Sequence, residues 1–130
     1  MKKLFFCVLF AIFSVVVSAQ KKIPTENDSI VFENTVYDFG SMNKGSKATC
    51  EFTFTNKGKK FLTINQVHPV CACTEVEWSK KPIAPGEVGH IKVIYNTQLT
   101  GGFSKAITVH STAANSLVVL VVNGAVLPEE

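Results

Sequence analysis

Residues 47–55 read KATCEFTFT, and they alternate between polar and apolar along the whole stretch. The apolar set comprises Ala48, Cys50, Phe52 and Phe54. The polar set comprises Lys47, Thr49, Glu51, Thr53 and Thr55. A period of two places successive side chains on opposite faces of an extended strand. The stretch therefore predicts a strand with one face in a hydrophobic core and the other in water.

Turn signals separate this strand from those that follow it. Asn56-Lys57-Gly58-Lys59 comes directly after it, and we expect Gly58 to adopt a positive φ there. Further along, Pro85-Gly86 predicts a type II turn, because Pro presets φ and Gly suits the left-handed position. The chain is therefore predicted to reverse direction repeatedly.

One N-terminal strand is predicted around 30–33 and 36–39, and further strands are predicted at 61–67, 70–78, 88–95, 103–110 and 117–122. The residues expected to point inward in these strands are Leu62, Ile64, Ile91, Val93, Tyr95, Ile107 and Val109. The 3.6-residue period of a helix does not occur beyond residue 20. Short strands with regularly spaced turns indicate an all-β fold, an antiparallel β-sandwich of about seven strands over residues 30–127.

The last predicted strand has no polar face, because it reads LVVLVV from Leu117 to Val122. Such a strand is normally covered on both faces. We expect either the flank of the first strand or another molecule to cover its outer face. In the second case the strand would form a site for a protein partner or for an oligomer.

The first residues have the layout of a secretory signal peptide. A basic start precedes an apolar run from Leu4 to Val17, and small residues before Gln20 suit a cleavage site. The run is shorter than the roughly 20 residues that a membrane span needs. We therefore expect a cleaved signal peptide at 1–19 and a mature chain without a membrane span. The protein is predicted to be exported, to the periplasm or out of the cell.

The polar segment 20–29 is expected to be a flexible leader onto the domain. Asn27-Asp28-Ser29 forms a glycosylation sequon, and Asp28-Ser29-Ile30 fits a short pattern that is glycosylated on some secreted bacterial proteins. Asn27 and Ser29 are therefore candidate glycosylation sites.

Charge and motifs exclude several classes of function. The chain has 13 basic residues, all of them Lys, against 10 acidic ones, and Lys2 and Lys3 lie in the signal segment. Nucleic-acid binding usually needs clustered positive charge and Arg, so no nucleic-acid partner is expected. A nucleophile elbow, a phosphate loop and a catalytic acid–base set are all absent from the sequence. We therefore expect neither an enzyme nor a cofactor.

Three cysteines remain after the signal segment, namely Cys50, Cys71 and Cys73, an odd number for an oxidising compartment. Three roles are open. A structural role would be packing, or a disulfide from Cys50 to Cys71 or Cys73. A redox role would use Cys71 and Cys73 as a reversible pair. A Cu(I) or Zn(II) site would use Cys71, Cys73 and His68 as ligands, although no two histidines lie at ligand spacing in the sequence.

The backbone geometry decides whether Cys71 and Cys73 can join directly. Residues two apart in a strand have Cα atoms roughly 6.5–7 Å apart, whereas disulfides span about 4.4–6.8 Å. Direct closure therefore requires a bend. A regular strand over 70–78 would place both thiols on the solvent face with Glu75 and Glu77, and would place His68 on the opposite face.

A family resemblance joins these motifs. Their order, Tyr37-Asp38-Phe39-Gly40, Phe52-Thr53-Phe54-Thr55-Asn56-Lys57-Gly58, Cys71-Ala72-Cys73-Thr74 and Ile83-Ala84-Pro85-Gly86-Glu87, resembles the bacterial domain-of-unknown-function 1573 family over residues 30–126. The resemblance implies an immunoglobulin-like sandwich, similar to Hydin-type and major-sperm-protein-like modules, which are usually non-enzymatic binding or scaffolding units. The family's Cys-Gly-Cys-Thr carries Ala72 in place of Gly here, which favours an extended backbone at this site.

Together these observations predict an exported, non-enzymatic binding or structural module with a protein or cell-envelope partner. One alternative is a thiol redox or Cu/Zn-binding protein that uses the Cys-x-Cys pair. A second alternative is an assembly subunit that pairs through its last strand, Leu117 to Val122.

Overall fold

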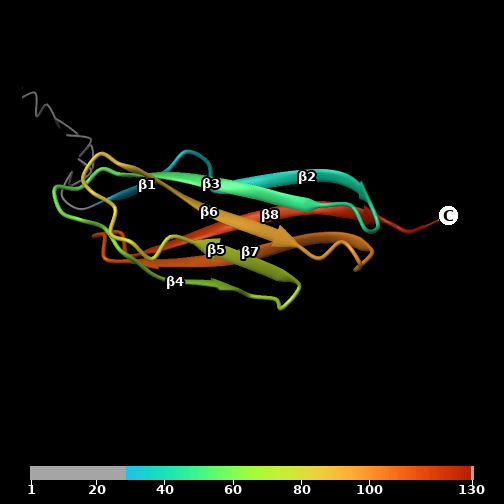
Figure 1. The fold of residues 1–130 in the computed structure, drawn as a ribbon. Coiled ribbons are helices and arrows are strands. Elements are labelled where there is room, and N and C mark those ends of the chain that lie inside the picture. The colour runs from blue at the N-terminus through green and yellow to red at the C-terminus, as the bar shows by residue number, and fades with distance from the viewer. Residues whose placement is uncertain (1–28, 130) are drawn as a thin grey trace, which may run out of the picture.

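The computed structural model describes residues 29–129 and shows an all-β domain (Figure 1). Its strands are β1 Ile30–Phe32, β2 Val36–Asn43, β3 Ala48–Asn56, β4 Ile64–Pro69, β5 Thr74–Trp78, β6 Val88–Tyr95, β7 Gly101–Ser111 and β8 Leu117–Leu127. Between residues 29 and 129 there is no helix, and so none long and apolar enough to cross a membrane. The predicted signal peptide, most of the predicted leader and Asn27 lie outside the described residues.

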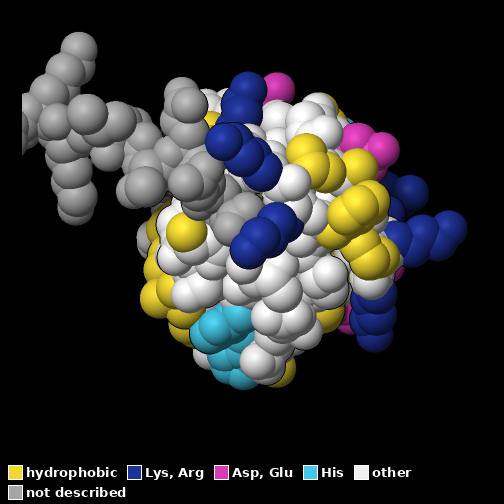
Figure 2. Space-filling view, turned by 90° about the vertical axis from the view of Figure 1, so that its left-hand side faces the viewer, with side chains coloured by type: hydrophobic (Ala, Val, Ile, Leu, Met, Phe, Trp, Pro, Cys, Tyr) yellow, Lys and Arg dark blue, Asp and Glu magenta, His cyan; other side chains and the backbone are white. Residues whose placement is uncertain are grey.

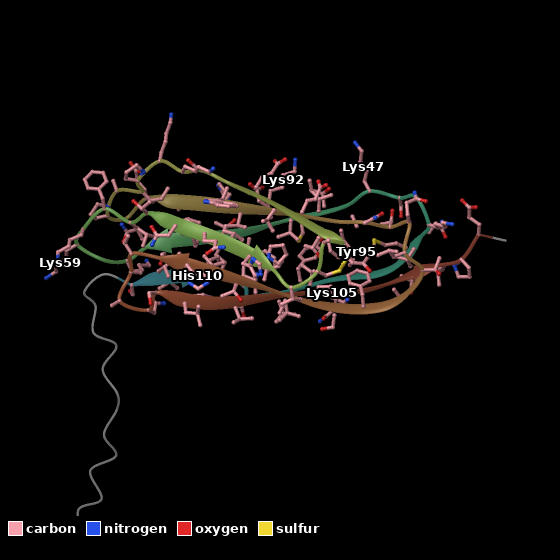
Figure 3. All side chains as sticks on the ribbon, turned by 90° about the horizontal axis from the view of Figure 1, so that it is seen from below. Lys47, Lys59, Lys92, Tyr95, Lys105 and His110 are labelled. Carbon is pink, nitrogen blue, oxygen red and sulfur yellow. A yellow bond between two sulfur atoms is a disulfide. The ribbon has the colours of Figure 1, made fainter. Side chains whose placement is uncertain are left out.

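The strands form two sheets that pack face to face. Sheet A has the order β1-β3-β6-β5, and sheet B has the order β2-β8-β7-β4. In an immunoglobulin domain the first, second, fifth and fourth strands share one sheet and the remainder form the other. The same arrangement is found here when β1 and β2 are counted as two halves of the first strand, so that β3, β6 and β5 are the second, fifth and fourth. Figure 3 shows the two layers edge-on. The predicted fold class is confirmed.

Two details differ from the prediction, and both arise at the first strand. The strand divides into β1 in sheet A and β2 in sheet B, which brings the total to eight. The chain crosses between sheets within three residues: the N–H of Glu33 still donates to Thr53 in sheet A, whereas the carbonyl of Thr35 accepts from Val121 in sheet B. Because the chain keeps its direction as it crosses, β2 pairs with β8 in parallel, so the sandwich is not purely antiparallel.

The core forms along the alternating stretch that predicted it. Ala48, Cys50, Phe52 and Phe54 of β3 are all buried, and β3 pairs along its length with β6. On β6, Ile91 and Val93 are fully buried. Gly89 lies directly opposite Phe54, and a Cβ atom there would come within 2.3 Å of the phenyl ring. The absence of a side chain at this position therefore makes room for the aromatic ring.

The two predicted turns have different outcomes. Gly86 adopts a φ of 81°, as predicted for the Pro85-Gly86 turn. Gly58 is not among the described glycines with positive φ, because Asn56 organises that turn instead. The buried Asn56 side chain accepts the N–H of Gly58 and donates to the carbonyls of Lys60 and Ile83, at 2.7 to 2.9 Å.

The start of the next strand was predicted too early. Leu62 is buried, as expected, but it forms only an isolated bridge to Ile83, and regular pairing begins at Ile64. Phe61 is exposed in the preceding loop. β4 then extends to Pro69, beyond the predicted end.

Candidate functional site

The three cysteines lie in two different environments. Cys50 is free and buried on β3, where it faces Val93 of β6. Burial raises the pKa of its thiol to about 11. The prediction that Cys50 packs as a small core residue is confirmed. The alternative, a disulfide from Cys50 to Cys71 or Cys73, is wrong, because those two cysteines bond to each other.

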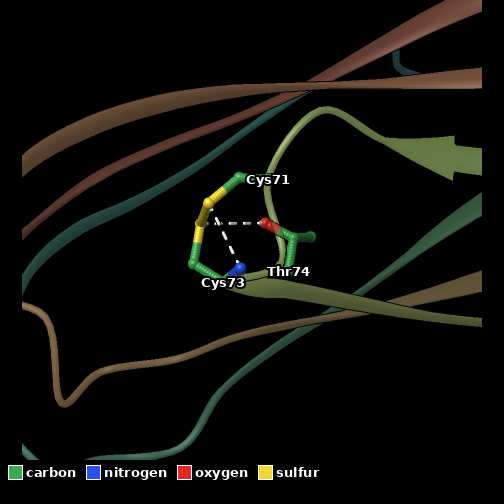
Figure 4. Close-up of a disulfide and its surroundings, with 3 residues drawn as sticks. All are labelled: Cys71, Cys73 and Thr74. Carbon is green, nitrogen blue, oxygen red and sulfur yellow. Dashed lines mark hydrogen bonds between the residues drawn. A yellow bond between two sulfur atoms is a disulfide. The ribbon is translucent and has the colours of Figure 1, made fainter.

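Cys71 and Cys73 form a disulfide inside a tight turn (Figure 4). Their Cα atoms are 5.1 Å apart, closer than an extended strand allows. The N–H of Thr74 donates to the carbonyl of Cys71 at 3.1 Å, which closes the turn. The prediction of a regular strand over 70–78 is therefore wrong, and so is the extended backbone expected from Ala72. A turn with this hydrogen bond does not require glycine, because type I geometry admits most residues.

The turn also changes the face on which the sulfurs lie. Cys73 is only 7% exposed, and Cys71 is half-buried against the core. The predicted grouping with Glu75 and Glu77 on the solvent face is therefore wrong for Cys73. That grouping assumes an unbroken strand, whereas the four residues 70–73 lie outside the strand ladder and the alternation starts again at Thr74.

Backbone contacts on both sides hold the turn between the layers. The N–H of Val70 donates to the carbonyl of Ala106 on β7 at 3.1 Å, and that of Asn96 donates to the carbonyl of Cys73 at 2.9 Å. Thr74 is buried and lies opposite Tyr95. Figure 3 shows the disulfide between the sheets, close to Tyr95.

An aromatic cluster occupies the core beside this turn. The rings of Tyr95 and Phe103 are stacked, with centroids 3.7 Å apart, and Phe39 lies 6.3 Å from Phe103. A Cβ atom on Gly124 would come within 2.8 Å of the Phe103 ring, so glycine there makes room for the cluster. The disulfide turn therefore lies beside a closely packed part of the core.

The candidate metal ligands are not brought together. His68 is exposed on the outer face of sheet B, whereas the two sulfurs lie between the sheets. Both sulfurs are also in the disulfide, and it is the thiolate that binds metals. Across residues 29–129 no group of three or more His, Cys, Asp or Glu side chains could hold a metal ion.

Sequence spacing missed one histidine pair. Gln66 pairs with His110 and His68 pairs with Thr108, so the two histidines are diagonal neighbours on adjacent strands. Figure 2 shows histidine side chains together at the lower edge of the molecule. Only strand register, which spacing within one element does not show, reveals this proximity.

The outer face of sheet A carries charges. Glu51 of β3 lies 3.7 Å from His90 of β6, and Lys92 of β6 lies 3.8 Å from Glu77 of β5. Thr53 contributes a hydroxyl 3.2 Å from the His90 ring. Figure 2 views the sandwich from one end, and charged side chains line its right-hand side. This face is typical of a solvated surface.

The outer face of sheet B is different, because its central strands carry no Asp, Glu, Lys or Arg side chain there. β8 contains no charged residue, and Lys105 of β7 lies opposite the buried Val122 and so belongs to the inner side. Leu117 and Val119 of β8 are 57% and 47% exposed, and Val36 of β2 is 53% exposed. The lower left-hand side of Figure 2 shows hydrophobic side chains and no Lys, Asp or Glu side chains.

Among the described residues, the apolar last strand is thus covered on its inner face and open on its outer face. The first strand was expected to cover the outer face with its flank, but its second half, β2, pairs with β8 edge to edge within the sheet. The expectation of cover from that flank is therefore wrong. β7 pairs with one edge of β8 from Leu117 to Val126, and β2 pairs with the other edge from Val121 onward, so in the described part of the chain a further strand could add only beside Leu117 to Leu120.

Comparisons with known proteins support this description of the fold. The model of a protein family described as "Protein of unknown function (DUF1573)" matches residues 30–126. The comparison with curated proteins gives no match. The family resemblance inferred from the motifs is therefore confirmed.

Solved structures similar to this chain include a protein of unknown function, a PapD-like domain and an MSP family member. A protein of unknown function from Porphyromonas gingivalis has a TM-score of 0.69 at 14% identity, covering 76% of this chain and 47% of that one. The ASH/PapD-like domain 7 of human CEP192 has a TM-score of 0.62 at 9% identity, covering 81% and 89%. WR4, an MSP family member of C. elegans, has a TM-score of 0.50 at 8% identity, covering 78% and 100%. The chain thus spans about half of the Porphyromonas protein, and these likenesses show the fold alone.

Proposed function

We propose that this chain, which belongs to the DUF1573 family, is an exported, non-enzymatic module that binds a protein partner through the outer face of sheet B. The observation that carries the proposal is the contrast between the two outer faces. The outer face of sheet A carries charged side chains with the contacts Glu51–His90 and Glu77–Lys92. The outer face of sheet B exposes valine and leucine side chains, without any charge on its central strands.

The exposed apolar residues form one continuous surface. Val36 lies beside Val121 in the β2–β8 pair, and Val119 and Leu117 follow on the same side of β8. On β7 their neighbours are Thr108, opposite Val119, and His110, opposite Leu117. Covering apolar surface contributes about 25 cal/mol per Å², so this face gains free energy when a complementary surface packs against it.

The chemistry of this face favours a protein over other partners. Nucleic acid is recognised through clustered positive charge, which the central strands of sheet B do not carry on this side. Protein interfaces, by contrast, combine an apolar centre depleted of charge with a polar rim. Here Thr108, His110 and Gln66 supply a polar margin on the β4 side of the exposed valines.

The partner would pack against side chains instead of extending the sheet. From Val121 onward β8 lies between β2 and β7 and cannot accept a further strand, so we expect the partner to contact the exposed side chains of this face. An assembly of identical subunits would stack face to face on the same surface. The absence of charge would permit this, so a second copy is an outcome that the experiment must be able to detect.

Site-specific photo-cross-linking in the producing cell tests the proposal. A photoreactive residue replaces Val119 in one variant and Thr53, on the outer face of sheet A, in the control. We expect a discrete protein adduct from position 119 and none from position 53. An adduct of twice the chain mass would assign the face to a second copy. The same adducts from both positions, or none from position 119, would overturn the proposal.

Export is tested separately by the intact mass of the protein recovered from the cell envelope and the medium. We expect a mature chain that begins at Gln20. A chain recovered only from the cytoplasm with its first 19 residues intact would contradict export, without bearing on the binding face.

A further inference from the structure

We propose that the Cys71–Cys73 disulfide is a reversible thiol–disulfide exchange site, and that Cys71 is the sulfur that an incoming thiolate attacks. This inference goes beyond the proposed binding function and does not depend on it. It rests on the connectivity of the bond, on the hydrogen bonds of its turn and on the unequal exposure of the two cysteines.

The connectivity shows that this bond adds little to the stability of the fold through chain entropy. The cysteines are two residues apart in sequence. A disulfide stabilises mainly by restricting the unfolded chain, and the restriction grows with the length of the loop that it closes. A bond across a single intervening residue therefore restricts the unfolded state much less than one that links two strands. A structural staple would join distant segments, as a bond from Cys50 to either cysteine would have done.

The turn is held in place by hydrogen bonds that do not involve the sulfur–sulfur bond. Val70 is bonded to β7 before the turn, Asn96 is bonded to the carbonyl of Cys73, and Thr74 closes the turn itself onto Cys71. We therefore expect these contacts to survive reduction and to keep the two thiols close. A frame that persists in both redox states allows the bond to re-form.

The two cysteines differ in their exposure to solvent. Cys71 is half-buried at the margin of the core, whereas Cys73 is 7% exposed and enclosed by it. An attacking thiolate can therefore approach Cys71 and not Cys73. The sulfur of Cys73 lies 3.8 Å from the Thr74 hydroxyl, which can donate a hydrogen bond to the thiolate that leaves (Figure 4). The sulfur of Cys71 accepts the N–H of Cys73 at 3.2 Å, so both sulfurs have a hydrogen-bond donor, and the difference in exposure decides which one is attacked.

The exchange is a two-electron reaction with a dithiol, either a small molecule or a protein. A thiolate of the dithiol attacks Cys71, a mixed disulfide forms at that sulfur, and Cys73 leaves as a thiolate that takes up the proton lost by the attacking thiol. The second thiol of the reductant then attacks the sulfur of its own molecule and releases Cys71 as a thiol. The dithiol is oxidised to a disulfide, and the protein gains two thiols.

Cys50 takes no part in this exchange, for a geometric reason. It belongs to β3, and β6 lies between β3 and β5, the strand that follows the turn. Its own thiol is buried in the core. The reduced protein therefore has two thiols that react as a pair and a third that stays protected while the fold is intact.

Reduction of the folded protein provides the first test. The mature protein is incubated with dithiothreitol in native buffer, trapped with an alkylating reagent and weighed, while circular dichroism follows the fold. We expect two alkyl groups, on Cys71 and Cys73, with an unchanged β spectrum and an unmodified Cys50. Reduction that proceeds only as fast as global unfolding, or that abolishes the fold, would overturn the proposal.

The choice of entry sulfur provides the second test. Wild-type protein is treated with the monothiol glutathione, quenched with acid and mapped by peptide mass. We expect the mixed disulfide on Cys71, and glutathione found mainly on Cys73 would contradict the assignment.

A third test compares the rates at which the matched variants Cys73→Ser and Cys71→Ser react with an aromatic disulfide reagent. We expect the thiol of Cys71 to react at least about tenfold faster than that of Cys73 in the folded state, and equally fast in denaturant. Equal rates in the folded state would overturn the proposal.

Discussion

Asn56 is the residue on which the β3–β4 turn depends, and its role shows how one buried polar group can define a loop. It is 1% exposed, and its amide satisfies one backbone N–H and two backbone carbonyls from separate segments. The sequence places an asparagine two residues before a glycine at this point, which predicts a turn. It does not show that the amide, and not the glycine, fixes the backbone, because the partner Ile83 lies in a distant loop.

Replacing Asn56 with alanine should therefore be costly. Asn56→Ala removes the three hydrogen bonds that this buried amide makes to the backbone of Gly58, Lys60 and Ile83, and we expect a loss of about 2–4 kcal/mol in the free energy of unfolding. Urea denaturation measures the loss. Asn65→Ala, at an exposed position of β4, is the matched control and should change stability by less than about 0.5 kcal/mol. Equal losses in the two variants would contradict the role assigned to Asn56.

The thiol of Cys50 makes stability depend on alkaline pH. Its pKa is about 11 in the folded state, against 9.0 for an ordinary cysteine, because burial disfavours the thiolate. Between these values the unfolded chain loses this proton and the folded chain keeps it. The contribution is therefore fully present below pH 9.0 and is lost as the pH rises toward about 11.

Denaturation of wild-type protein and of Cys50→Ala at neutral pH and near the upper end of this range isolates the effect. We expect the wild type to lose up to about 2–3 kcal/mol more than the variant as the pH rises. Parallel losses in both proteins would show that the Cys50 thiol is not the group responsible.

At the scale of the elements, β3 and β6 are the strands that the sequence specifies best. Their strict alternation predicts both the strand and its buried face, and the structure has Phe52 and Phe54 opposite Ile91 and Gly89. The division of the first strand is not visible in the same way. The switch of sheets at residues 33–35 depends on pairing with β3 and β8, which are far away in the sequence.

The Cys71–Cys73 turn shows why counting residues failed at the candidate site. Alternation correctly predicts that Glu75 and Glu77 are exposed on β5, because the strand is regular from Thr74 onward. It fails for Cys73, since the count was carried through a turn whose hydrogen bond spans residues 71 to 74. The Cys-x-Cys spacing identified the residues of the site, but only the fold shows which cysteine is accessible.

The contact between Gly89 and Phe54 gives a direct test of the β3–β6 pairing. Gly89→Ala would place a Cβ atom 2.3 Å from the Phe54 ring, and we expect a loss of about 1–3 kcal/mol as the ring is displaced. Chemical denaturation measures it. In Gly89→Ala/Phe54→Leu the two losses should be less than additive, because the smaller side chain relieves the clash.

Gly102→Ala is the matched control, because a Cβ atom at this position of β7 would have no neighbouring atom within 4 Å. We expect that variant to remain within about 0.5 kcal/mol of the wild type. Full additivity in the double variant would show that Gly89 and Phe54 are not in contact.

At the scale of the whole molecule, the sandwich is asymmetric. Its interior is packed by both sheets, yet one outer face is charged and the other exposes an apolar strip along β2 and β8. The sequence indicated that the last strand has no polar face, but it could not show whether the protein covers that face itself. The answer depends on where β2 pairs, and β2 pairs at the edge of β8.

The disulfide turn and the apolar face are separate features of this architecture. The turn lies between the sheets, whereas the apolar strip faces outward from sheet B. Loss of one should therefore leave the other intact, so the binding proposal and the exchange proposal can fail independently.

The central claim is that the outer face of sheet B is the binding surface, and a pair of lysine substitutions tests it most directly. Val119→Lys and Thr53→Lys introduce the same charge at exposed or half-exposed positions on opposite faces. The measurement is the affinity of each variant for the protein that cross-links at position 119, with thermal melts as the control for folding. We predict that Val119→Lys lowers the affinity at least about tenfold, because the charge must be desolvated in the interface, whereas Thr53→Lys leaves it unchanged and both variants melt like the wild type. Unchanged affinity in a folded Val119→Lys variant would contradict the account.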